Sequence, residues 1–105
     1  SVSYPYFGIG FVPVTPELAA QADLSVETGV LVTAVSPGGP ADDAGIRAGD
    51  VILSIDGQQI DEQHPFSEVL FSHKPGETVD VVIQRNDLQM TVTVTLGTRP
   101  ASTGQ

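Results

Sequence analysis

Residues 44–57 read Ala44-Gly45-Ile46-Arg47-Ala48-Gly49-Asp50-Val51-Ile52-Leu53-Ser54-Ile55-Asp56-Gly57. A proline stands shortly before this stretch, at position 40. Proline early in a segment and glycine just past its end are typical of a short helix, here over residues 40–45. We expect Gly45 to end that helix in left-handed geometry, which glycine adopts without a Cβ clash. Arg47 is expected to be solvated.

The second half of the stretch predicts a strand. Gly49-Asp50 turns the chain, residues 50–55 form a buried strand, and Asp56-Gly57 is a strong signal for a tight turn. We expect three side chains to enter the core: Ile46, Val51 and Ile52. Because the role of this stretch is structural, substitutions in it are expected to unfold the domain and not merely to weaken binding.

Apolar patterning extends the strand assignment outward. Alternation over residues 78–85 and 89–96 predicts a last hairpin. A near-continuous β-branched run over residues 29–35 predicts a buried central strand. Residues 9–14 read as a further strand, in which pairing on one side should stop at Pro13, since proline has no N–H to donate.

Two more segments predict short helices. Thr15 suits an N-cap, with proline at the first helical position and the helix continuing to Ala22. Residues 65–73 carry apolar side chains at helical spacing. The chain is therefore mainly β with short helices (α+β): about five strands and two to three helices in a compact antiparallel sheet or partly open barrel. Residues 99–105 are small and polar, and we expect a flexible tail there.

Composition limits the function classes. The 105 residues suffice for one domain with a modest core, and no cysteine is present for a disulfide or thiolate site. Four Lys and Arg against 13 Asp and Glu give a net charge of −9, which opposes binding to nucleic acids or anionic membranes. The acidic residues scatter through turns as a solvated surface. No signal peptide is visible, and we expect a domain cut from a larger protein.

An aromatic-Gly-aliphatic loop runs into the first strand as Tyr6-Phe7-Gly8-Ile9-Gly10-Phe11. If Gly8 takes positive φ, the N–H groups of residues 7–9 can turn toward one point and bind an anion. The natural anion beside an open strand is the carboxylate of a peptide, whose remaining residues then pair with that strand. The alternative is a glycine-containing strand entry with no ligand.

This loop and residues 44–57, in this order along the chain, resemble the PDZ domains of bacterial HtrA/Deg serine proteases. The resemblance covers about residues 4–98. It implies a PDZ-like partly open barrel in the bacterial, permuted strand order, with the loop near the N-terminus and the hairpin near the C-terminus. It also implies a regulatory domain of the bacterial cell envelope, which captures extended C-terminal or exposed unfolded segments by β-augmentation and serves a separate trypsin-like domain.

The resemblance assigns a site. Its carboxylate-binding loop would be Tyr6, Phe7, Gly8 and Ile9, and its strand and pocket would be Ile9, Gly10, Phe11, Val12, Phe66, Val69, Leu70 and His73. The four helix residues cannot all face the groove, and the sequence does not fix the helix rotation. An apolar pocket would take an apolar last residue of the ligand. Many HtrA-type loops have a basic residue just upstream, where this chain has Tyr4 and Pro5, so the carboxylate is held by amides alone or the positive charge comes from elsewhere.

We expect no catalysis, cofactor or metal. No serine stands in a Gly-x-Ser-x-Gly turn, and neither a phosphate loop nor a dinucleotide fingerprint is present. His64 beside Asp61 and Glu62 is a poor metal site, since converging ligands are needed. The two acids flank the proposed groove helix and could disfavour acidic ligands. His73, near a helix end, is expected to meet terminal carbonyls or to read a ligand side chain.

Two alternatives stay open. The module could belong to a site-2 protease, a carboxyl-terminal processing protease or a secretion protein. It could instead be an assembly domain whose groove is filled by its own tail, residues 99–105, or by a neighbouring chain. In the favoured interpretation the partners are peptide or unfolded-protein C-termini and the parent protease domain, and any oligomerisation runs through that parent.

Overall fold

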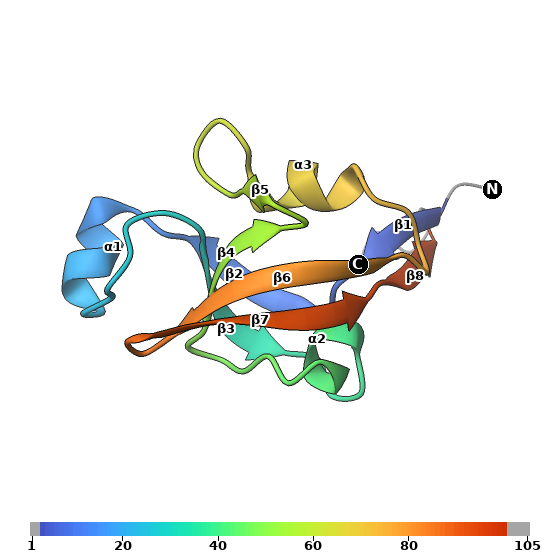
Figure 1. Ribbon diagram of the computed structural model, residues 1–105, viewed down its shortest axis with the longest axis horizontal. Coiled ribbons are helices and arrows are strands. Elements are labelled where there is room, and N and C mark those ends of the chain that lie inside the picture. The colour runs from blue at the N-terminus through green and yellow to red at the C-terminus, as the bar shows by residue number, and fades with distance from the viewer. Residues whose placement is uncertain (1–2, 101–105) are drawn as a thin grey trace.

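The computed structural model describes residues 3–100 of the chain, and within them lie eight strands and three short helices (Figure 1). In chain order the elements are β1 (Ser3–Tyr6), β2 (Ile9–Pro13), α1 (Pro16–Gln21), β3 (Val30–Val35), α2 (Pro40–Asp43), β4 (Val51–Ile55), β5 (Gln58–Gln59), α3 (Phe66–Phe71), β6 (Thr78–Arg85), β7 (Leu88–Thr95) and β8 (Gly97–Pro100).

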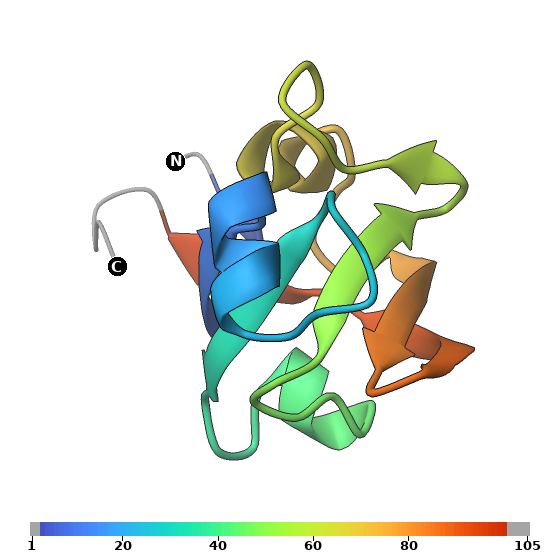
Figure 2. The same cartoon turned by 90° about the vertical axis from the view of Figure 1, so that its left-hand side faces the viewer.

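The main sheet is antiparallel, in the order β2-β3-β4-β6-β7, with the short β5 paired to β4. A separate two-stranded ribbon joins β1 to β8. Both views place α2 and α3 on opposite sides of the curved sheet (Figures 1 and 2). The predicted mainly β architecture is confirmed. The strands β1, β5 and β8 were not predicted, because they are only two to four residues long and show no clear alternation.

The predicted helix starts and turns follow from local chemistry. The Thr15 side chain accepts a hydrogen bond from the Leu18 N–H at 3.1 Å, as an N-cap does. Gly45 has φ of +89° just after α2, which confirms the expected left-handed helix end. The last hairpin is also confirmed, because β6 pairs with β7 along its whole length.

The core lies inside the curved sheet. It takes Ile46 and Ile52, two of the three side chains predicted from residues 44–57, together with the inward face of β6. The third, Val51, is buried at 2% exposure but does not belong to this cluster. The run at residues 29–35 forms a central strand, as predicted, since β3 lies between β2 and β4. The expected burial holds only in part, because Val30 and Val32 of β3 are buried while Thr33 and Ala34 are exposed. A register shift between Gly10 and Phe11 interrupts the β2–β3 pairing at this point, and the outer face of β3 is left to solvent.

Asp50 lies in the turn before β4 and not, as expected, in the strand itself. It is only 2% exposed, and both of its carboxylate oxygens accept hydrogen bonds from Arg85, at 2.9 and 2.8 Å. The Arg47 N–H donates to the same carboxylate at 2.9 Å. Hydrogen bonding to Asp50 raises the pKa of Arg85 above its ordinary value, so the guanidinium stays charged. The contact connects the residue 44–50 turn to β6.

The expected flexible tail at residues 99–105 needs correction. Residues 99 and 100 are not part of a flexible tail, because they pair with Tyr4 and Ser3 in the β1–β8 ribbon. The Arg99 guanidinium lies 4.4 Å from the centroid of the Tyr6 ring, a cation–π contact that adds to the main-chain pairing. Residues 101–105 of the predicted tail lie outside the described part of the chain.

Candidate functional site

The loop between β1 and β2 presents main-chain donors to one side. The Phe7 carbonyl accepts from the Ala41 N–H, and the Gly8 carbonyl accepts from the Ser36 N–H, both at 3.0 Å. In a trans peptide the N–H points opposite to the carbonyl of the same plane, so the N–H groups of Gly8 and Ile9 face away from these partners.

Gly8 makes this geometry accessible. Its φ is +83°, in the region that favours glycine. Among residues 3–100, no hydrogen bond uses the N–H of Phe7 or Gly8. The loop therefore has donors available for an anion, as the sequence suggested.

The outer edge of β2 is unpaired in the described chain, because β2 stands at the end of the sheet order. Hydrogen bonds from Ser36 to Gly8 and from Val14 to Gly29 fix which residues bond to β3. By the alternation of an antiparallel ladder, Gly10 and Val12 bond inward, while Ile9 and Phe11 direct their N–H and C=O groups outward. Pro13 also faces outward, where its missing N–H ends the row of donors.

A small cavity of about 160 Å³ adjoins the loop and lies between β1, the start of β2 and α3. Phe66 of α3 packs edge-on against the rings of Phe7 and Phe11, with centroids 5.3 and 4.8 Å apart. Tyr4 and Phe71 stack at 5.4 Å. The lining residues are Tyr4, Pro5, Tyr6, Phe7, Gly8, Ile9, Phe11, Phe66, Ser67, Leu70, Phe71 and Arg99.

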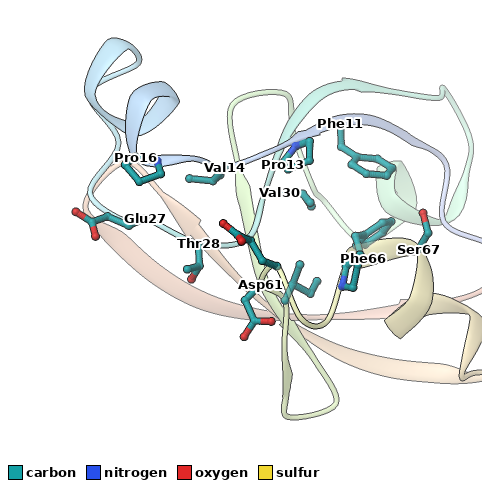
Figure 3. Close-up of a pocket in the computed structure, with 14 residues that line it drawn as sticks. Phe11, Pro13, Val14, Pro16, Glu27, Thr28, Val30, Asp61, Phe66 and Ser67 are labelled. Carbon is teal, nitrogen blue, oxygen red and sulfur yellow. The ribbon is translucent and has the colours of Figure 1, made fainter.

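A larger cavity of about 610 Å³ continues the groove past the end of β2 (Figure 3). It shares Phe11, Phe66 and Ser67 with the small cavity, so the two form one groove along the open edge. Figure 3 shows Phe11 and Phe66 close together at one end and the carboxylates of Glu27 and Asp61 toward the other. The other lining residues are Pro13, Val14, Pro16, Thr28, Gly29, Val30, Ile60, Glu62 and Pro65, which make the wall mostly apolar.

The predicted site residues divide into two groups. The structure brings together along the groove Tyr6, Phe7, Gly8, Ile9, Phe11, Phe66 and Leu70. Four others lie elsewhere. Gly10 and Val12 bond to β3. Val69 is 5% exposed and belongs to the core. His73 pairs through Nδ1 with Glu77, so its expected role at the groove mouth is not supported.

Three groove residues were not predicted from the sequence: Ser67, Phe71 and Arg99. The apolar pattern of residues 65–73 identified the helix but not its rotation, which places Leu70 and Phe71 at the small cavity and Val69 in the core. No spacing rule links Arg99 to a loop more than 90 positions earlier. Pairing of β1 with β8 creates that contact.

The histidines offer no metal site in the described chain. His64 Nδ1 lies 3.0 Å from Asp61 Oδ1, an exposed local pair, and residues 3–100 contain no cluster of three or more potential metal ligands. None of the helices described is long and apolar enough to cross a bilayer.

Known proteins with similar sequences identify the family of this chain. The family model described as "PDZ domain" matches residues 5–96. A protein of Halomonas elongata described as a DegP-like periplasmic serine endoprotease is 36% identical over 102 residues, which cover 97% of this chain and 22% of that protein. The chain thus spans about a fifth of that relative's length.

Solved structures of related proteins have a similar fold. The HtrA-type protease AlgW, determined with a decapeptide, is 32% identical and superposes with a TM-score of 0.83, covering 94% of this chain and 30% of AlgW. The HtrA3 PDZ domain, determined with a phage-derived ligand, is 21% identical with a TM-score of 0.79, covering 99% of this chain and 96% of that one, and shows the likeness of fold.

Proposed function

The chain belongs to the PDZ domain family, and on that premise we propose that it captures the free C-terminal end of an extended peptide. The observation that carries the proposal is the row of outward main-chain groups that starts at the loop, at Gly8 and Ile9, and continues to Phe11. Neutral amides suit a carboxylate, because charge-assisted hydrogen bonds form without a cationic side chain.

The geometry defines a ligand register. With its carboxylate at the loop amides, the last ligand residue pairs with Ile9 and the third residue from the end pairs with Phe11. The last side chain would then enter the small cavity. Its aromatic and aliphatic wall favours an apolar residue, whose burial is worth about 1.5 to 3 kcal/mol.

Residues further upstream reach the larger cavity. Pro13 ends the direct pairing there, so side-chain contacts must provide the remaining specificity. The wall is mostly apolar and three carboxylates border it, those of Glu27, Asp61 and Glu62. We therefore expect apolar or basic upstream residues to bind better than acidic ones, as opposite charges attract and like charges repel.

The domain carries no catalytic function of its own in this proposal. AlgW and the Halomonas relative are proteases that contain a similar domain as one part of a longer chain. We assign this chain to the regulatory part of an HtrA/Deg-type serine protease of the cell envelope, in keeping with relatives named periplasmic. Residues 3–100 leave the outer edge of β2 unpaired, so a guest segment can pair with it.

A C-terminal peptide library tests the proposal. We expect selection of an apolar last residue and depletion of acidic upstream residues. Selected peptides should bind with micromolar affinity, and amidation of the C-terminus should weaken binding by at least about tenfold, since the amides lose their anion. Isothermal titration of the free-acid and amidated forms measures this ratio. Equal affinity of the two forms would rule out carboxylate capture.

A further inference from the structure

The loop lacks an upstream basic residue, yet a cation lies at the small cavity. The whole chain has four Lys and Arg residues. Arg85 forms an ion pair with Asp50, and neither Arg47 nor Lys74 lines the groove. Arg99, from β8, does line the small cavity together with the loop residues Tyr6 to Ile9.

Two contacts fix the position of Arg99. Its main chain lies opposite Tyr4 in the β1–β8 ribbon. Its guanidinium lies over the Tyr6 ring, at 4.4 Å from the centroid, and Tyr6 is the residue that leads into the loop. Stacking on a ring face leaves the N–H groups at the guanidinium edge available, so this contact orients the cation without using all its donors.

No carboxylate competes for this cation within the described chain. The ion pairs of residues 3–100 involve Asp61, Glu77 and Asp50, and none of them includes Arg99. The carboxylates that border the groove, Glu27, Asp61 and Glu62, line the larger cavity at its other end and are absent from the lining of the small one. The groove is therefore positive where the ligand carboxylate would lie and negative upstream.

We propose that Arg99 is the charge partner of the ligand's C-terminal carboxylate, replacing from the C-terminal strand the basic residue that the loop lacks. The proposal rests on carboxylate capture as the function of the loop. Arg99 acts as a specificity-determining residue: it favours a free C-terminus over an internal or amidated segment. Tyr6 is a positioning residue, because its ring holds the Arg99 guanidinium in place.

Three variants separate this role from a structural one. Arg99→Gln keeps a long polar side chain but removes the charge, and Arg99→Lys keeps the charge. Lys74→Gln makes the same change in net charge on an exposed residue that lines neither cavity of the groove. Each is titrated with a free-acid peptide and its amidated form at low and high salt, and thermal unfolding verifies the fold.

We expect Arg99→Gln to weaken binding of the free acid by about fivefold to tenfold, to leave the amidated peptide unchanged and to reduce the salt dependence. Arg99→Lys should retain most of the affinity, and Lys74→Gln should bind as the unaltered protein does. Suppose that the unaltered protein prefers the free acid. If Arg99→Gln then shows the same preference, or loses affinity for both peptides to the same extent, the proposed role of Arg99 is wrong and carboxylate capture stands. If the unaltered protein binds both peptides equally, carboxylate capture itself fails.

Discussion

Replacing Asp50 with alanine is expected to lower the free energy of unfolding by about 3 kcal/mol, and at most about 5 kcal/mol. The substitution leaves the Arg85 charge without its bidentate partner and the Arg47 N–H without its acceptor. Because the Arg85 side chain is 23% exposed and can regain some solvent, we favour the lower value. Such a loss is a large share of the roughly 5 to 15 kcal/mol that stabilises a typical domain.

Urea unfolding followed by circular dichroism measures this loss. Asp87→Ala is the matched control, since Asp87 is exposed in the turn after β6 and its side chain makes none of the hydrogen bonds found in residues 3–100. Its change should stay within about 0.5 kcal/mol. The double variant Asp50→Ala/Arg85→Ala should lose less than the sum of the single variants. Additive losses, or a loss below about 1 kcal/mol for Asp50→Ala, would contradict a coupled ion pair.

N-methylation of the third ligand residue from the C-terminus should weaken binding strongly. In the proposed register the N–H of this residue donates to the outward carbonyl of Phe11. A methyl group removes that hydrogen bond and places bulk against β2, so we expect affinity to fall by about tenfold or more. Titration calorimetry on synthetic peptides measures the change.

The penultimate ligand residue provides the control. Its N–H points away from β2 in the same register, so N-methylation there should change affinity by less than about threefold. Equal losses at both positions would indicate that the ligand does not pair as an added strand. A larger loss at the penultimate position would indicate a register shifted by one residue.

The sequence was most informative where structure depends on neighbouring residues. Residues 44–57 predicted a helix end at Gly45, a turn and a buried strand, since glycine geometry and apolar alternation act over a few positions. The loop at Gly8 was predicted for the same reason. Pro13 ends the row of outward donors as expected, because the missing N–H is a property of the residue itself.

Contacts between distant residues could not be predicted in this way. The Asp50–Arg85 pair spans 35 positions, and the contact of Arg99 with Tyr6 depends on a ribbon between the two ends of the domain. The rotation of α3 is set by packing against Phe7 and Phe11, which sequence spacing does not encode. This is why Val69 and His73 were expected at the groove and Phe71 was not.

The central claim is that the N–H groups of Gly8 and Ile9 are open donors for a peptide carboxylate, and NMR of the ¹⁵N-labelled domain observes them directly. On titration with a free-acid peptide, we expect both amide protons to shift downfield and to gain protection from hydrogen exchange. The amidated peptide should produce much smaller changes at these two amides. If both resonances stay in place while the free-acid peptide binds, or respond identically to the two peptides, the carboxylate is not bound at this loop.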